Sequence, residues 1–369
     1  MKSAWLVRLG ALSLVPILAV ACSSSTASPS TAPASAGASA TATAVASVVA
    51  SAAAGGKTGP FVIGVSNDSV ANAFRVQMEN EIKYYAKQHP ELISNLIVLD
   101  AGGDTNKQIS DVEDLITRKV DAIVLSPNSS TALNPAIADA KAAGIPVATY
   151  NMSVTDSTDV LVQVAPPFQQ WEKDQTAWLV QQMGATGNVI ALRGIAGTPV
   201  DAEEWAGAQE ILSANPNVKI ICTEYANWDY GAAKTAVQNC LANHPTVNGI
   251  LSVGDAMTWA AGEVMAAQGY DITKIPMIGI GGGNGALKWW LKNPTIKAQM
   301  IGDRTDVAVI ATEDVLNFLQ GKTGAAVSIP ETVITTQNVS QYAQPSMPDA
   351  VWLVGTQLPL DVLKQEAGS

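Results

Sequence analysis

Short apolar runs alternate with longer stretches of helical periodicity along most of the chain. In the stretch 109–118, apolar Ile109, Val112, Leu115 and Ile116 recur at the three-four spacing of an amphipathic helix. The apolar runs are mostly continuous, which is typical of parallel strands covered by helices on both faces. The pattern predicts an α/β protein with strands at 61–65, 96–99, 122–125, 146–149, 160–164, 188–192, 218–222, 249–253, 276–280 and 296–301.

The predicted strands form two successive sets, the first ending at 160–164 and the second beginning at 188–192. One sheet holding all of them would be unusually large for this architecture. We therefore expect two doubly wound, Rossmann-like lobes, each with its own parallel sheet.

Ligands of open α/β sheets bind outside the carboxyl ends of the strands, so the residues that follow each strand are the candidates for a site. These residues are mostly small and polar and rarely positively charged, as in Ser66-Asn67-Asp68, Tyr150-Asn151-Met152 and Gly302-Asp303-Arg304. Two lobes facing each other would form a cleft suited to a neutral polyhydroxylated ligand or to one with some positive charge.

The chain has 9 Trp against 4 Phe, an unusual ratio for a core of plain hydrophobic residues. Tryptophan offers a large apolar face and one hydrogen-bond donor, and it suits a site that stacks and orients a ligand. Trp228, just beyond a predicted strand, is the best candidate for this role. For Trp205, Trp259 and the pair 289–290 on predicted helices, packing in the core or between lobes is the better interpretation.

The N-terminus has the layout of a secretory signal over 1–21, with Lys2 and Arg8 before an apolar run that ends in small residues. Cys22 follows, and the junction resembles the lipobox of bacterial lipoproteins, although Ala19 stands where that family usually has leucine. We expect Cys22 to be acylated and 22–59 to be a disordered tether rich in Ser, Ala, Thr and Pro. The protein would then be anchored by lipid to the outer face of the cell membrane. The alternative is an ordinary cleaved signal or an uncleaved anchor in which Cys22 is incidental.

Charge and composition exclude several functions. The formal net charge is −11, which leaves no electrostatic footprint for nucleic acid. The only histidines, His89 and His244, both precede prolines, so we expect neither a histidine-rich metal site nor a histidine-dependent triad. The glycine-rich stretch 279–285 superficially resembles a dinucleotide-binding turn, but it follows the ninth strand rather than the first. A NAD-dependent enzyme is therefore a remote alternative, and we expect no cofactor and no enzymatic activity.

Two cysteines remain after Cys22. An oxidising compartment and an even count favour a disulfide between Cys222, at a strand end, and Cys240, late in the following helix. Two buried free thiols are the alternative.

Several stretches resemble a known family position by position. They are 61–66, 72–75, 120–128, 142–147, 192–198 and 254–257. Over nearly all of 61–339 the chain resembles the type I periplasmic sugar-binding proteins, the ribose and galactose group that serves ATP-binding-cassette (ABC) importers.

This resemblance implies two lobes joined by a three-strand hinge. The N-terminal lobe would hold 60–163 and 302–333, and the C-terminal lobe 164–301 and 334–369, with the tail from Gln341 packed near the hinge. The protein would be a monomer that closes on a small-molecule ligand and delivers it to an ABC permease. A receptor that signals to a chemotaxis or sensor kinase partner is the alternative.

The resemblance also assigns residues to the site, with Trp228 as the aromatic that stacks on the sugar. Asp255 has a second interpretation as a helix cap, as does Asn72. Together with the strand-end residues, the expected ligand-binding set is Ser66, Asn67, Asn72, Phe74, Arg75, Asn151, Glu204, Trp228 and Asp255.

Several charged or amide residues that grip hydroxyl groups in this family are replaced. Asn151-Met152 replaces an Asp-Arg pair and Glu204 an Arg, while Gly254, Gly281 and Gly302 replace Asn, Asp and Gln. A neutral sugar is the first expectation for the ligand. A bulkier saccharide that fills the space at Gly281 and Gly302, an amine-bearing ligand or a nucleoside remain alternatives.

Overall fold

The computed structural model describes residues 56–322, 327 and 329–366, all within the compact unit Thr43–Ser369. The expected signal 1–21, Cys22 and the tether up to residue 55 lie outside the described residues. Among the helices of the described part, none is long and apolar enough to cross a membrane.

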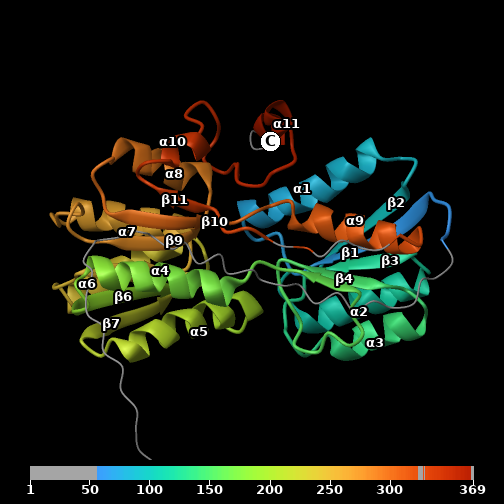
Figure 1. Ribbon diagram of the computed structural model, residues 1–369, viewed down its shortest axis with the longest axis horizontal. Helices are drawn as coiled ribbons and strands as arrows, with labels where there is room; N and C mark the ends of the chain where they lie inside the picture. Colours follow the sequence, from blue (N-terminus) through green and yellow to red (C-terminus); the bar gives the residue numbers. More distant parts are fainter. Residues whose placement is uncertain (1–55, 323–326, 328, 367–369) are drawn as a thin grey trace, which may run out of the picture. The chain divides into compact units, whose positions relative to one another are not determined.

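The first sheet is entirely parallel and has the strand order β2-β1-β3-β4-β5. Helices α1 and α9 cover one of its faces, and α2 and α3 cover the other (Figure 1). The strands are β1 (Phe61–Asn67), β2 (Ile93–Asp100), β3 (Ala122–Leu125), β4 (Val147–Tyr150) and β5 (Val162–Val164), and the helices are α1 (Ala73–Gln88), α2 (Thr105–Thr117), α3 (Asn134–Ala142) and α9 (Val307–Leu319).

The second sheet has the order β11-β10-β9-β8-β6-β7, and all its strands are parallel except the edge strand β11. Its strands are β6 (Gly187–Arg193), β7 (Val218–Tyr225), β8 (Gly249–Ser252), β9 (Met277–Gly281), β10 (Ala298–Gly302) and β11 (Val333–Thr335). One face is covered by α4 (Phe168–Gln182) and α5 (Pro199–Ala214), and the other by α6 (Tyr230–Asn243), α7 (Asp255–Ala267) and α8 (Asn284–Lys292). The short helices α10 (Val339–Tyr342) and α11 (Leu360–Glu366) follow.

The predicted fold class is confirmed, and each predicted strand is present; β3 has the predicted ends, and the ends of the others are shifted. The main shift that matters for the site is in β1, which continues through Ser66 and Asn67 because both pair with β2. β11 was not predicted as a strand, since its three residues are too short to form a recognisable apolar run.

The chain passes from the first sheet to the second after Val164. It returns to the first sheet after Gly302, where the next helix, α9, packs on β3, β4 and β5. It reaches the second sheet again at Val333, which pairs with Ile301. The exact limits of the two lobes stay a prediction.

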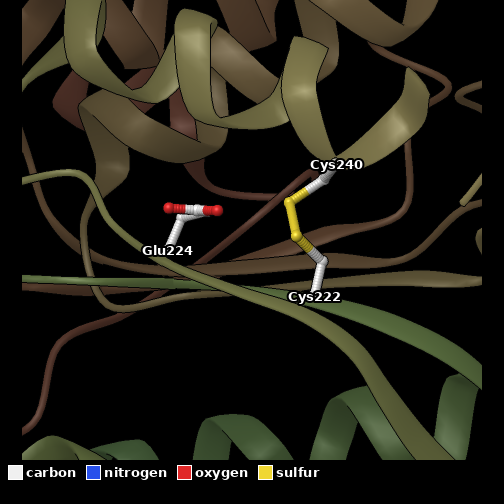
Figure 2. Close-up of side chains that lie close together, drawn as sticks. All are labelled: Cys222, Glu224 and Cys240. Carbon is white, nitrogen blue, oxygen red and sulfur yellow. A yellow bond between two sulfur atoms is a disulfide. The ribbon is translucent and has the colours of Figure 1, made fainter. Parts of the chain in front are cut away.

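A disulfide links β7 to α6. Cys222 and Cys240 are bonded, with their Cα atoms 5.8 Å apart and a sequence separation of 18 (Figure 2). A carboxylate oxygen of Glu224 lies within 4.8 Å of both sulfur atoms. The disulfide leaves neither sulfur as the thiolate that a metal ion requires.

Replacing both Cys222 and Cys240 with alanine should lower the free energy of unfolding by about 2–4 kcal/mol, because the crosslink no longer restricts the unfolded chain. Urea unfolding followed by circular dichroism measures the change. Dithiothreitol should lower the free energy of unfolding of the native protein as much as the double substitution does, because it reduces the same disulfide. An equal response of the native protein and the double variant to the reductant would contradict the prediction.

Candidate functional site

A cavity of about 360 Å³ lies where the carboxyl ends of strands from both sheets meet. The turn before α1 and the residue after β4 contribute to it from the first sheet. The segments after β7, β8, β9 and β10 contribute from the second sheet, together with α4, α5 and the C-terminal segment. This is the position at which open α/β sheets bind their ligands.

Most of the expected binding residues line this cavity. The structure places seven of them in the lining, and their contact with a ligand stays a prediction: Asn72, Phe74, Arg75, Asn151, Glu204, Trp228 and Asp255. Ser66 and Asn67 are not in the lining. They lie within β1 rather than after it, where Ser66 is fully buried and Asn67 accepts a hydrogen bond from the Tyr150 hydroxyl at 3.4 Å.

Helix α1 begins at the cavity wall. The side chain of Asn72 caps the helix by accepting the Arg75 N–H at 3.0 Å, so its expected capping role is present. The buried guanidinium of Arg75 donates to Asp68 and to the Ser126 hydroxyl, both at 2.8 Å. Burial raises the pKa of Asp68, and the Arg75 charge opposes that rise. Arg75 is thus held rigidly by a partner of opposite charge.

Trp228 lies flat against a wall made of glycines. Its indole N–H donates to the Val253 carbonyl at 3.1 Å, and its backbone has φ of 53°, which is uncommon for a bulky residue. A Cβ at Gly194 would come within 2.1 Å of the indole, and one at Gly254 within 2.9 Å. The ring therefore occupies the space that these two glycines leave.

The other glycine replacements do not open extra room for a ligand. A Cβ at Gly281, which has φ of 152°, would come within 2.3 Å of the Asp255 carboxyl carbon. A Cβ at Gly302 would come within 2.9 Å of Val354. Side chains of the protein fill both spaces, so the expectation that a bulkier saccharide fills them is wrong. Asn151 lines the cavity as expected, while its neighbour Met152 is buried in the core of the first sheet.

Asp255 holds the glycine-rich turn after β9. Its carboxylate accepts the backbone N–H groups of Gly282 and Gly283, at 2.9 and 2.6 Å, and that of Ala256 at 2.7 Å. Asp255 is the first residue of α7, and the N-cap position is Gly254, so the second interpretation of Asp255 as a helix cap is wrong. Its side chain instead joins the start of α7 to the turn after β9. In a dinucleotide site the turn amides would have to be free for a pyrophosphate, and here they are bonded to a carboxylate.

Three carboxyl groups of the cavity are deeply buried. Burial, together with Glu172, Asp201, Asp303 and Glu203 nearby, raises the pKa of Glu204 well above its usual range. Burial likewise raises the pKa of Asp303 to about 7 and that of Asp255 to about 6. Within the described residues, Oε2 of Glu204 has no hydrogen-bond partner, although the side chain is only 1% exposed.

The structure also adds residues to the site. Asp303 directly follows β10; it was among the strand-end candidates but not in the expected binding set. Trp259, for which packing was the better interpretation, packs on the core of the second sheet and also lines the cavity. Phe168 and Tyr230 line it from the starts of α4 and α6, where the sequence offers no distinct signal.

The segment 344–358, here called the C-terminal strap, forms part of the cavity wall through Asp349, Ala350 and Trp352. Gln77 of α1 exchanges two hydrogen bonds of 2.9 Å with the Trp352 backbone, and the indole packs edge-on against Phe74 at 5.2 Å. On the other side, Asn284 at the start of α8 donates to three strap carbonyl groups. The strap therefore connects α1 of the first sheet with α8 of the second.

The protein without ligand should lose about 4 kcal/mol of stability between pH 5 and 8. Below about pH 4 the cavity carboxyls are protonated in both the folded and the unfolded states. Their contribution to the free energy of unfolding is then at its highest. That contribution disappears as the pH rises through folded-state pKa values of about 6 for Asp255 and about 7 for Asp303. Urea unfolding at a series of pH values measures the slope.

Asp303→Asn should flatten this pH dependence, because the amide carries no proton to lose. Asp139→Asn, at an exposed position of α3, is the matched control and should leave the slope unchanged. A native protein whose stability rises steadily over this pH interval would contradict the assignment.

Comparison with known proteins places this geometry in a family. Residues 63–323 match the family described as "Periplasmic binding protein domain". The chain is 29% identical over 262 residues to the ribose import binding protein RbsB of Bacillus subtilis, covering 71% of this chain and 83% of that protein. It is 26% identical to the xylitol-binding protein of Mycolicibacterium smegmatis, covering 60% of this chain and 61% of that one.

Solved structures agree with this result. A solute-binding protein of an ABC transporter from Thermobispora bispora superposes with a TM-score of 0.72 at 24% identity, covering 84% of this chain and 95% of that chain. One from Actinobacillus succinogenes with bound D-allose gives a TM-score of 0.65 at 26% identity, covering 76% and 99%. The resemblance seen in the sequence is confirmed, and the chain belongs to the periplasmic binding protein domain family.

Proposed function

We propose that this protein is an extracytoplasmic receptor that captures a sugar and delivers it to the permease of an ABC importer. The observation that carries the proposal is the cavity of about 360 Å³ at the carboxyl ends of both sheets, in a chain of the periplasmic binding protein domain family. Its volume lies within the range of small-molecule sites, about 300–1,000 Å³.

The lining suits a sugar because it combines aromatic faces with side chains that can bind hydroxyl groups. Phe74, Phe168 and Trp228 offer surfaces for the apolar face of a ring, and Asn72 and Asn151 offer amides. Oδ1 of Asn151 is buried without a partner among the described residues, so a ligand hydroxyl could donate to it. Related proteins carry names that include ribose, xylitol and D-apiose, which are also small polyols or sugars.

Binding would act through closure of the two lobes. A ligand that touches walls from both sheets interacts better with the closed arrangement, and this difference in affinity shifts the population toward it. The permease would then recognise the closed form. We further propose that acylated Cys22 and the tether keep the receptor, as a monomer, at the outer face of the membrane.

A thermal-shift screen of the purified protein against pentoses, hexoses, polyols and amino sugars tests the proposal. A ligand present at 100 times its Kd stabilises the folded state by about 2.7 kcal/mol, which raises the Tm by several degrees. We expect at least one sugar or polyol to produce such a shift. If no member of the panel shifts the Tm, the proposal is contradicted.

Trp228→Ala should weaken binding of that sugar at least tenfold, because the ring loses its stacking surface; isothermal titration calorimetry measures the loss. Trp178→Ala is the control, since Trp178 is also partly exposed but packs on the core beneath α4 and α5, away from the cavity. The control should lower the Tm without changing affinity. Equal affinities of the native protein and Trp228→Ala would contradict the assigned role.

A further inference from the structure

The charged side chains that line the cavity are strongly unbalanced. The lining has one basic residue, Arg75. Its guanidinium is already paired with Asp68, which lies outside the lining. The acidic residues of the lining are Glu204, Asp229, Asp255, Asp303 and Asp349.

Three of these carboxylates are satisfied by the protein. Asp255 accepts three backbone N–H groups, Asp229 caps α6 through the Ala232 N–H, and Asp349 forms an ion pair with Lys288 at 2.5 Å. Asp349 therefore has a cation beside it, Asp255 has three donors, and Asp229 is exposed to solvent, so none of the three is a buried acid that lacks donors.

Glu204 and Asp303 are different. Oε2 of Glu204 is buried with no partner among the described residues. Asp303 accepts one hydrogen bond, from the Arg304 N–H to Oδ1, while Oδ2 has no partner in the described chain. Both residues line the cavity, and each keeps a carboxylate oxygen without a hydrogen-bond partner among the described residues. Glu204 and Asp303 are here called the acidic pair.

Among the described residues, none of the charged groups that act on Glu204 is basic. Arg193 is bonded to Asp201 at 2.6 Å and lies between the rings of Trp205 and Tyr225. Glu172, the other close neighbour, is itself a fully buried acid. A buried carboxylate without a partner is costly, so a site that retains one is matched to a ligand that supplies the missing charge or donor.

The aromatic residues of the lining complete the pattern. Phe74, Phe168, Trp228, Tyr230, Trp259 and Trp352 line the same cavity. Aromatic faces attract a cation through the negative potential above the ring, and the attraction is stronger where water is excluded. An acidic pair within an aromatic wall is the chemistry that recognises an ammonium group.

We propose that the natural ligand is a sugar or polyol that carries a protonated amino group, and that Glu204 and Asp303 bind this ammonium. The inference rests on the proposed function, because the aromatic faces and amides still bind the polyhydroxylated part. Hydroxyl groups of a neutral sugar would donate to the two carboxyls but would leave their charge uncompensated.

The pair also links binding to protons. In the ligand-free protein, burial favours the protonated form of both acids, and Asp255, Asp201, Glu172, Glu203 and Arg75 are the charged groups that act on them. When an ammonium group binds, the carboxyls give up their protons to solvent. Affinity for an amine ligand therefore rises with pH until the amine itself loses its proton, whereas affinity for a neutral sugar does not rise.

Isothermal titration calorimetry of the purified protein with matched ligands tests the proposal. The probes are glucose, glucosamine and N-acetylglucosamine, the corresponding galactose series, and the hydroxyl-free cations putrescine and choline. We expect an amino sugar to bind at least tenfold more tightly than its parent sugar and its N-acetyl form at pH 7. Titrations in buffers of different ionisation enthalpy should show that protons are released.

Glu204→Gln and Asp303→Asn keep the shape of each side chain and remove its charge, so each should reduce the preference for the amine at least fivefold. Glu210→Gln, at an exposed position of the same helix α5 and outside the cavity lining, is the matched control and should retain the preference. Preserved preference in both cavity variants would overturn the assignment of the two residues.

The remaining outcomes separate this inference from the proposed function. Tight binding of a neutral sugar with no gain from an amino group would overturn the inference and leave the sugar receptor intact. Binding of putrescine or choline without any sugar would overturn the sugar receptor and support the cation site. If none of the probes binds, the inference is overturned, whereas the sugar receptor fails only if the wider thermal-shift panel also gives no response.

Discussion

The carboxylate of Asp255 fixes the part of the cavity on which most other features depend. By accepting the N–H groups of Gly282 and Gly283, it sets the turn that starts α8. That turn positions Asn284, whose amide holds the carbonyl groups of the C-terminal strap. The strap in turn brings Trp352 against Phe74. One buried carboxylate thus connects the ninth strand, the strap and the first helix.

Ionisable side chains at this cavity are buried in two different ways. Arg75 and Asp68 form a pair of opposite charges with a hydroxyl beside it, so the guanidinium has a fixed position and little net field. Glu204 and Glu172 are both fully buried, and the charge of Glu172 acts on Glu204. The first arrangement serves rigidity. In the second, burial raises the pKa of both acids well above the usual range, and such shifts are typical of functional sites.

The fold was predictable from the sequence because continuous apolar runs and helix periodicity reflect burial directly. Seven cavity-lining residues were also predictable. Asn151, Trp228 and Asp255 follow predicted strands, whereas Asn72, Phe74, Arg75 and Glu204 were expected from the family resemblance. Ser66 and Asn67 were misplaced because the length of β1 depends on pairing with β2, which a single strand's sequence does not encode. The sequence did not identify Trp352 as a residue of the cavity wall, because its contacts with Gln77 and Phe74 join positions far apart in the chain.

The position of α9 and the strap also determines when a nascent chain becomes a receptor. Helix α9 covers β3, β4 and β5, yet the ribosome makes it only after nearly all of the second sheet. Until then one face of the first sheet is only partly covered, and the cavity wall is incomplete until Trp352 follows. A chain whose translation stops early therefore lacks a finished cavity, and only completely synthesised molecules can compete for ligand.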